Sequence, residues 1–201
     1  MPKKGVEGFK IYLAGRIPIG NEVGVDPLWR ERYRQMLEKF IPRVVIFDPA
    51  YRNIDEEDAI AIFGHDLFLI KESDLMLVNA EIPIGLGTAQ EMVIAKYFQK
   101  PVVSVSPRGS YYSPFKEKIN GQKVSNWRHP FLYVFSDWIL EDVKEIKYVL
   151  TEKLKNKKMQ KWKTFMSRPI QYYLRKCFSE DIKTKEMLGM EILKHAKRET
   201  C

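Results

Sequence analysis

The stretch that decides the fold is Ser73–Val105, which reads SDLMLVNAEIPIGLGTAQEMVIAKYFQKPVVSV. It begins with a short apolar run, Leu75–Val78, which is typical of a buried strand. Pro83–Thr88 contains two glycines, so we expect a tight loop that a ligand can approach closely. Ala89–Phe98 has the spacing of a helix, and Val102–Val105 is typical of the next strand. The order of strand, loop, helix and strand predicts a right-handed crossover unit of a parallel sheet.

The chain on either side of this unit repeats the alternation of strands and helices. Further strands are expected at Phe9–Ala14, Val44–Phe47 and Phe131–Phe135. Further helices are expected at 27–40, at 59–71 with Ile60, Phe63, Leu67 and Ile70 buried, and at 140–155. The sequence therefore predicts an α/β fold with a doubly wound, flavodoxin-like or Rossmann-like sheet that is mostly parallel and flanked by helices, followed by a C-terminal helical extension.

Length and composition indicate a globular protein. The 201 residues suffice for one ordinary domain and an appendage, and 45% of them are hydrophobic. No apolar run approaches the roughly 18 residues that span a bilayer, and the start lacks the apolar core of a signal peptide. The two cysteines, Cys177 and Cys201, form no framework, so a reduced, cytoplasmic compartment is expected. The sequence contains no CxxC, HExxH or P-loop motif, so we expect neither a metal site nor a cofactor.

Charge divides the chain into two parts. Residues 151–201 contain 14 Lys and Arg and 6 Asp and Glu, so they carry the whole net charge of +8. Residues 1–150 are neutral overall. We therefore expect an α/β domain at 1–150 and a basic, amphipathic helical extension at 151–201.

Polar residues and glycines follow the predicted strands at the edge where open α/β sheets bind ligands. Gly15 permits a tight turn after the first strand. Arg16 could hold a phosphate through its guanidinium, or it could be an ordinary solvated arginine. Asp48 ends the second strand and either faces the site or caps the following turn. Glu91, near the start of the predicted helix, is either a functional carboxylate or a residue favoured there only by the helix dipole.

Several motifs resemble the nucleoside 2-deoxyribosyltransferase family. That family typically has a strand ending in a loop, then Gly-Thr-Ala-x-Glu, an Ala-bearing helix and a Lys-Pro-Val strand. Gly87, Thr88, Ala89 and Glu91 fit this pattern. The first strand, IYLAG, and the later series Asp66, Ile70, Ser73 and Asp74 also fit it. The resemblance extends from about residue 9 to about residue 150.

The resemblance implies roles for individual residues. Glu91 would be the nucleophile, and Tyr12 would hydrogen-bond to it, although a core aromatic on a strand is the alternative for Tyr12. Asp66 would lie near the sugar and the base and handle a proton, whereas Asp74 would be structural. The backbone of Gly87 and Thr88 would shape the pocket against the sugar. The reaction of the family requires no metal and no organic cofactor.

Gly85 is a departure from the family. Many members have an aspartate six residues before the catalytic glutamate, where it binds a sugar hydroxyl. The related deoxynucleoside 5′-monophosphate N-glycosidases have a serine there, followed by Leu-Gly, and they hold the 5′-phosphate. Gly85 can offer only its backbone N–H, but the sequence Gly85-Leu86-Gly87 and the position of Arg16 are closer to that second branch.

The predicted function is cleavage of the N-glycosidic bond of a nucleoside, with transfer of the deoxyribosyl group to another base through a Glu91 glycosyl-enzyme. One alternative is a nucleoside 5′-monophosphate N-glycosidase that uses water. The other is a protein that binds nucleotides or nucleic acid without turnover. The expected partner is a small nucleoside or nucleotide, and the resemblance also implies a homo-oligomer.

The basic extension has helical spacing with interleaved aromatic residues. This combination can indicate nucleic-acid binding or a membrane surface. We favour a simpler interpretation, an amphipathic helical hairpin packed on the protein or on another subunit, and expect no membrane partner. Pro169 is expected to break or restart the first helix, and Ser179 is expected to cap the last one.

Overall fold

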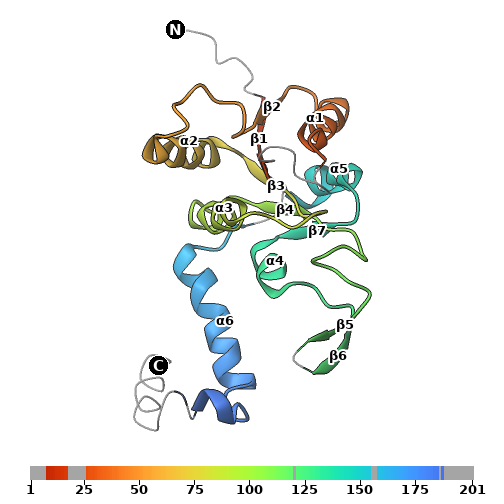
Figure 1. Ribbon diagram of the computed structural model, residues 1–201, viewed down its shortest axis with the longest axis vertical. Coiled ribbons are helices and arrows are strands. Elements are labelled where there is room, and N and C mark those ends of the chain that lie inside the picture. The colour runs from red at the N-terminus through yellow and green to blue at the C-terminus, as the bar shows by residue number, and fades with distance from the viewer. Residues whose placement is uncertain (1–7, 18–25, 120, 155–157, 186, 188–201) are drawn as a thin grey trace. The chain divides into compact units, whose positions relative to one another are not determined.

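The computed structural model describes residues 8–17, 26–119, 121–154, 158–185 and 187. The chain divides into two compact units, residues 1–159 and 160–201, and each is described by itself. Figure 1 labels their helices and strands. Among the described residues, no helix has both the length and the apolar character needed to cross a membrane.

The first unit is built on a five-stranded parallel sheet. Its strands are β1 (Phe9–Ala14), β2 (Val44–Phe47), β3 (Leu75–Asn79), β4 (Val102–Val105) and β7 (Trp138–Leu140). Their order is β2-β1-β3-β4-β7, and every neighbouring pair is parallel. Tyr12 of β1 lies opposite Phe47 of β2 and Met76 of β3. This order confirms the predicted doubly wound sheet, with a switch of direction between β1 and β3 where such sheets bind ligands.

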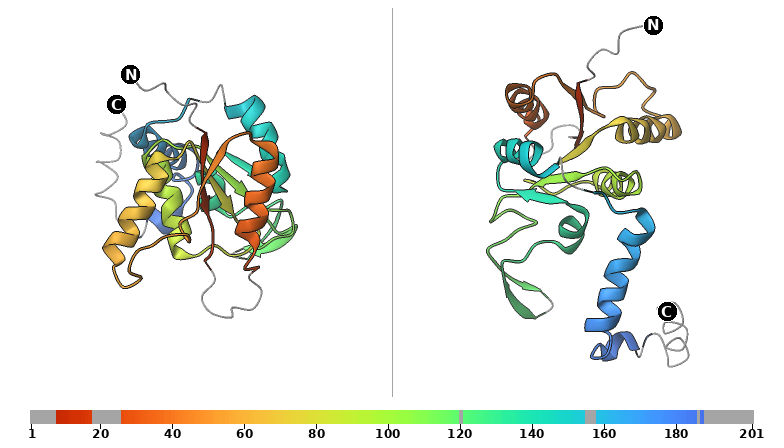
Figure 2. Two further views of the ribbon diagram at one scale, coloured as in Figure 1. Left: turned by 90° about the horizontal axis from the view of Figure 1, so that it is seen from above. Right: turned by 180° about the vertical axis from the view of Figure 1, so that it is seen from behind.

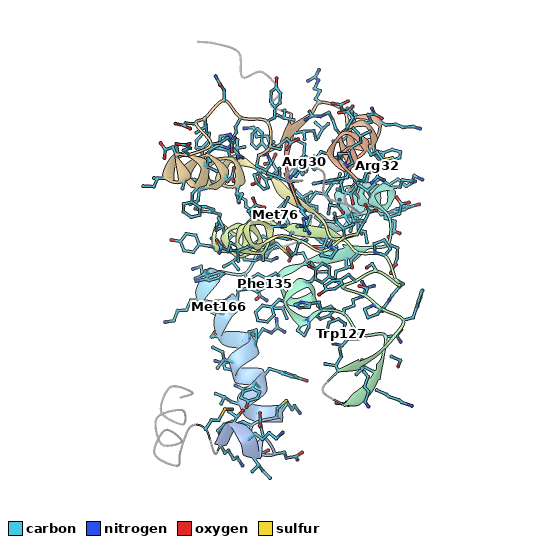
Figure 3. The ribbon with its side chains drawn as sticks, viewed as in Figure 1. Arg30, Arg32, Met76, Trp127, Phe135 and Met166 are labelled. Carbon is cyan, nitrogen blue, oxygen red and sulfur yellow. The ribbon has the colours of Figure 1, made fainter. Side chains whose placement is uncertain are left out.

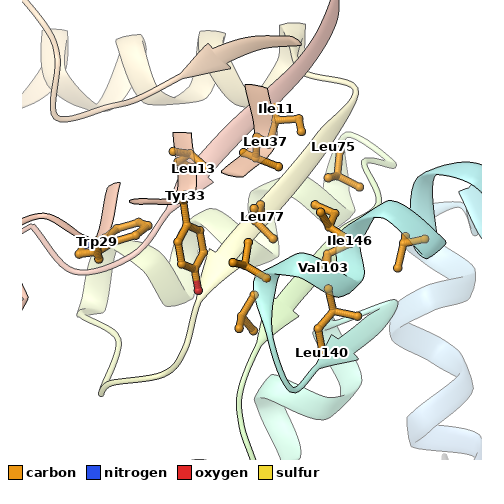
Figure 4. Close-up of a cluster of buried hydrophobic side chains, with 13 residues drawn as sticks. Ile11, Leu13, Trp29, Tyr33, Leu37, Leu75, Leu77, Val103, Leu140 and Ile146 are labelled. Atoms are coloured by element: carbon orange, nitrogen blue, oxygen red, sulfur yellow. The ribbon is translucent and has the colours of Figure 1, made fainter. Parts of the chain in front are cut away.

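Helices cover both faces of this sheet (Figure 2). They are α1 (Trp29–Phe40), α2 (Ala59–Glu72), α3 (Leu86–Tyr97) and α4 (Pro130–Phe135), followed by the consecutive turns η1 (Val143–Glu145), α5 (Ile146–Tyr148) and η2 (Val149–Lys153). One face is packed against α1 and the segment from η1 to η2, where Trp29, Tyr33, Leu37 and Ile146 are buried (Figure 4). The other face is packed against α2, α3 and α4, where Ile70, Met92, Ala95 and Leu132 are buried. Parallel sheets need both faces covered, which explains the continuous apolar runs of their strands.

Helix α3 begins earlier than predicted. It starts at Leu86 rather than Ala89, after an extended Gly85 with φ −78° and ψ 172°. No acidic residue lies in its first turn, because Glu91 falls in the second turn. The interpretation of Glu91 as a helix-start residue favoured by the dipole is therefore wrong, since that effect is confined to the first turn.

The last strand of the sheet lies later than predicted. The segment expected as a strand at Phe131–Phe135 is helix α4, and the strand is β7 at Trp138–Leu140. Pro130 occupies the first position of α4, where its fixed φ suits a helix and its missing N–H costs nothing. Only Leu132 of this helix is buried, so the β-branched and aromatic residues around it gave a misleading strand signal. The helix expected at 140–155 is the series of short turns from η1 to η2.

One hairpin has no counterpart among the predicted elements, and one further expectation about the first unit is wrong. The hairpin lies after β4 and consists of β5 (Lys116–Ile119) and β6 (Gln122–Ser125). Helix α2 buries Ile70 alone, whereas Ile60 is 85% exposed and Phe63 is 55% exposed. Only the last turns of α2 therefore pack against the sheet.

The second unit contains α6 (Trp162–Lys176), which continues through Pro169 rather than breaking there. The cap after α6 is Asp181, which accepts a hydrogen bond from the N–H of Thr184, so the prediction of Ser179 as the cap is wrong. Most of the predicted last helix lies outside the described residues.

Candidate active site

The centre of the site is a hydrogen bond between β1 and α3. The hydroxyl of Tyr12 donates to Oε1 of Glu91 over 2.8 Å, across 79 positions of the sequence. Tyr12 is fully buried in the middle of the sheet, so its ring is held by packing on all sides. This is the hydrogen bond that the resemblance led us to expect.

Burial controls the charge of this pair. It raises the pKa of Glu91 to about 7, with a further rise from the charge of Asp66. The Tyr12 hydrogen bond and the charge of Arg30 act in the opposite direction and lower the pKa of Glu91. Burial and the Glu91 charge raise the pKa of Tyr12 well above its usual range, so the phenol stays protonated and donates. Glu91 therefore changes charge near neutral pH, which suits a group with a role in catalysis.

Asp66 lies close to this pair, on α2. Its charge raises the pKa of both Tyr12 and Glu91. Oδ1 of Asp66 lies 3.0 Å from Nδ1 of His65, and both side chains are largely buried. The structure thus brings together the three residues predicted as catalytic, Tyr12, Asp66 and Glu91.

The residues after β1 are tied to helix α1. A side chain at Gly15 would have its Cβ 2.6 Å from the ring of Trp29, so this position has no room for one. The carbonyl of Gly15 accepts from Arg30 over 2.9 Å, and the carbonyl of Arg16 accepts from Trp29 over 3.1 Å. The backbone at the end of β1 is therefore fixed.

Asp48, at the end of β2, caps the following turn, which is one of the two interpretations that the sequence left open. Its Oδ1 accepts from the N–H of Ala50 over 3.0 Å and so caps the turn. The same carboxylate lies 3.5 Å from Nη1 of Arg30 and 3.8 Å from Nη2 of Arg34. It also lines a cleft of about 730 Å³ together with His65.

The loop before α3 lines a different cleft from the one that Asp48 lines. Gly85 lines a separate, mostly apolar cleft of about 480 Å³, with Tyr111 and Tyr112. Neither Gly85 nor Gly87 has an atom within 4 Å of the position a Cβ would take, so packing does not require these glycines. Thr88 is buried beside them at 4% exposure.

Two features of the site region had no sequence signal. Arg30 occupies a polar position on an amphipathic helix, and nothing in the pattern separates it from the other arginines of α1. The Tyr112 hydroxyl accepts from the N–H of Ile84 over 2.8 Å and so holds the loop before α3.

The expectation that Asp74 is structural is met, because its carboxylate accepts from the N–H of Lys10 over 2.8 Å. Within the described part of the chain, no group of three or more His, Cys, Asp or Glu side chains could hold a metal ion.

Several solved structures share the fold of this chain. A conserved protein from Enterococcus faecalis V583 aligns with a TM-score of 0.54 and 16% identity, over 74% of this chain and 98% of that one. A 2-desoxiribosyltransferase from Leishmania mexicana aligns with a TM-score of 0.50 and 19% identity, over 72% of this chain and 99% of that one. A 2-deoxyribosyltransferase from Bacillus psychrosaccharolyticus aligns with a TM-score of 0.49 and 24% identity, over 72% and 95%. No protein-family model and no curated protein matches the sequence. The Leishmania mexicana enzyme shows that a deoxyribosyltransferase is among the structures with this fold, as the sequence resemblance predicted.

Proposed function

We propose that this protein breaks the N-glycosidic bond of a nucleoside or nucleotide, with Glu91 as the nucleophile. The observation that carries the proposal is the partly buried hydrogen bond of 2.8 Å from Tyr12 to Glu91. It orients one carboxylate, and attack on a sugar carbon needs such an oriented carboxylate.

The reaction proceeds in two displacements. Glu91 attacks C1′ of the sugar, and the bond from C1′ to the base nitrogen breaks with its electron pair leaving on the base. Asp66 in its protonated carboxyl form gives its proton to the departing base and becomes a carboxylate, and a glycosyl ester is left on Glu91. A nitrogen of a second base then attacks C1′, the ester bond breaks, and the acceptor proton returns to Asp66. Glu91 is regenerated as a carboxylate.

Hydrolysis is the second candidate, because water could attack the same ester. The sequence Gly85-Leu86-Gly87 favours this alternative, because it is closer to the N-glycosidases than to the transferases, although Gly85 lacks the serine hydroxyl of the N-glycosidases. A side chain there would have nothing within 4 Å, so the space beside Gly85 is open.

A base-release assay tests the proposed function. The protein is incubated with deoxynucleosides, ribonucleosides and their 5′-monophosphates, with and without an added free base, and the products are separated by chromatography. A new nucleoside only in the presence of the added base identifies a transferase. Free base without an acceptor identifies an N-glycosidase, and a preference for monophosphates would support Arg16 as a phosphate ligand. No base released from any substrate would contradict the proposal.

The pH dependence of the reaction should follow Glu91. Its carboxylate must be ionised to attack C1′, so kcat/KM is expected to fall as the pH drops below about 7, the pKa of Glu91. In Tyr12→Phe the hydrogen bond that lowers this pKa is gone, so the midpoint should move above 7 and the rate at pH 7 should fall about tenfold or more. Profiles of kcat/KM from pH 5 to 9 measure both effects.

Tyr133→Phe is the matched control for this profile, because Tyr133 is 64% exposed on α4. It should leave the midpoint where the parent protein has it. An unchanged midpoint in Tyr12→Phe would contradict the role of the Tyr12 hydrogen bond in lowering the pKa of Glu91.

A further inference from the structure

Arg30, on α1, has a buried guanidinium in which two nitrogens make no hydrogen bond to the described residues. Nη2 donates to the carbonyl of Gly15 over 2.9 Å, and the guanidinium carbon lies 4.3 Å from the centre of the Trp29 ring. These two contacts fix the group. Nε and Nη1 are buried and, within the described residues, make no hydrogen bond. Buried donors are normally paired, so an acceptor on a ligand could satisfy these two nitrogens, which have no hydrogen-bond partner among the described residues.

An acceptor carboxylate lies beside these donors. Nη1 of Arg30 is 3.5 Å from Oδ1 of Asp48, and both side chains are only 11% exposed. The distance allows an electrostatic attraction but lies outside the usual range of a hydrogen bond. A donor edge and an acceptor edge therefore stand next to each other on the same side of the sheet.

The cleft around this pair suits a neutral, flat and polar ligand. It has a volume of about 730 Å³, and its lining includes Arg30, Arg34, Glu31, Asp48, Phe47 and Tyr51. Two cations and two anions balance in that set, and two rings offer surfaces for stacking. A phosphate dianion would be repelled by the carboxylates of Glu31 and Asp48, whereas a heterocyclic base carries no net charge.

The cleft also adjoins the proposed catalytic groups. His65 lines it, and Nδ1 of His65 lies 3.0 Å from Oδ1 of Asp66. The charge of Arg30 lowers the pKa of Glu91, so the guanidinium lies within electrostatic reach of the nucleophile. A leaving base must lie on the far side of C1′ from Glu91 and within reach of the acid that protonates it. His65, which lines the cleft and contacts Asp66, connects the cleft to the group proposed to protonate that base.

We infer that Arg30 and Asp48 bind the hydrogen-bonding edge of the base. Arg30 donates through Nε and Nη1 to a carbonyl oxygen or ring nitrogen, and Asp48 accepts from a neighbouring N–H of the same base. The inference rests on the proposed function for the position of the base, and it names the ligand class as a neutral heterocycle with adjacent acceptor and donor atoms. Because both nitrogens are shielded in the ligand-free chain, binding includes a small movement of side chains in the cleft.

Calorimetry with two series of free bases tests this inference without any turnover. The first series is adenine, purine and benzimidazole, and the second is cytosine, 2-pyrimidinone and 2-pyridone. The first step of each series removes the amino donor, and the second step removes ring-nitrogen acceptors. The protein should bind at least one series, with affinity falling about tenfold at each step.

Variants assign the steps to the two residues. In Asp48→Leu, removing the amino donor should no longer lower the affinity, while removing ring-nitrogen acceptors still should. In Arg30→Met the pattern should be the reverse, with only the loss of the amino donor lowering the affinity. The control is Arg32→Met, two residues along the same helix with a side chain that is 55% exposed, and it should keep both steps (Figure 3). Thermal melts confirm that each variant is folded. If Arg30→Met does not fold, Arg30→Lys keeps the charge, loses the paired donors and should give the same result.

Three results would overturn the inference. The first is a folded Arg30 variant that keeps both losses of affinity along the series. The second is an Arg30 variant that loses only the turnover of 5′-monophosphates. The third is a parent protein that binds neither series. The proposed function can fail separately. Stepwise base binding without any base release would leave the base site standing and remove the reaction.

Discussion

Replacing Glu91 with glutamine is expected to abolish glycosyl transfer and to make the protein more stable. Loss of the attacking carboxylate should lower kcat by about a thousandfold or more, because a neutral amide cannot form the glycosyl ester. Glutamine keeps the shape of the side chain and an oxygen that can accept from Tyr12. The loss of activity would therefore reflect the missing nucleophile rather than a damaged fold.

The gain in stability follows from the pKa of Glu91. Burial raises that pKa from an ordinary value of 4.5 to about 7 in the folded protein. A raised pKa means that ionisation opposes folding, so the cost is absent below about pH 4 and complete above about pH 7. A pKa that is about 2.5 higher in the folded than in the unfolded protein corresponds to about 3 kcal/mol of lost folding free energy. Glu91→Gln escapes this cost, so its melting temperature at pH 8 should exceed that of the parent by about 6–12 °C.

Thermal melts at pH 4 and pH 8 measure this effect, and the advantage of Glu91→Gln should vanish at the lower pH. Glu38→Gln on the exposed surface of α1 is the matched control and should change neither activity nor stability. Retained activity in Glu91→Gln would remove Glu91 as the nucleophile. A variant that is less stable than the parent at pH 8 would show that the carboxylate is not desolvated as described.

The second large effect is expected at a buried ion pair between α3 and the start of β7. Nζ of Lys96 contacts Oδ2 of Asp137, with side chains only 5% and 10% exposed. The same Asp137 oxygen accepts from the N–H of Val102 over 2.7 Å. Lys96→Met would leave the Asp137 charge buried without its cation. We expect a loss of about 3–5 kcal/mol in the free energy of unfolding, or about 6–20 °C in melting temperature.

Removing both charges should cost less than the two single changes together. In Lys96→Met with Asp137→Asn, the amide can still accept from Val102 and no unpaired charge remains, so the double variant should recover part of the stability. Lys144, which lies 3.8 Å from Asp142 with both side chains more than half exposed, provides the control. Lys144→Met should have little effect, because exposed ion pairs contribute little. Chemical denaturation of the four variants measures these differences, and equal losses at Lys96 and Lys144 would contradict the account.

The sequence predicted the sheet better than its surroundings. Strands β1, β2 and β4 lie at their predicted positions, because strands buried on both faces are continuous apolar runs. The segment at 131–135 was mistaken for a strand because its composition favours β structure, while the deciding influence was a proline at the start of a largely exposed helix. Hairpin β5–β6 is charged and sits apart from the main sheet, so it has no apolar signal.

The candidate site was predictable only in part. Tyr12, Asp66 and Glu91 belong to a pattern that a resemblance can supply, and the fold brings them together. Arg30 and Lys96 could not be found in this way, because their importance comes from burial. Burial of a charged side chain depends on which elements pack together, and an arginine or lysine on a helix is usually solvated.

The order of the strands also constrains how the protein folds. Strand β1 pairs with segments that begin at Val44 and Leu75, and no two neighbouring strands of the main sheet can form as a local hairpin. Each pairing must close a long loop before any contact compensates for the lost entropy, and sheets of this kind fold slowly, in about milliseconds to seconds. Tyr12 and Glu91 are separated by 79 positions, so their hydrogen bond can form only after β1, β3 and α3 have all assembled. A growing or partly folded chain therefore lacks the Tyr12–Glu91 pair, and the proposed activity should appear only with the complete α/β unit.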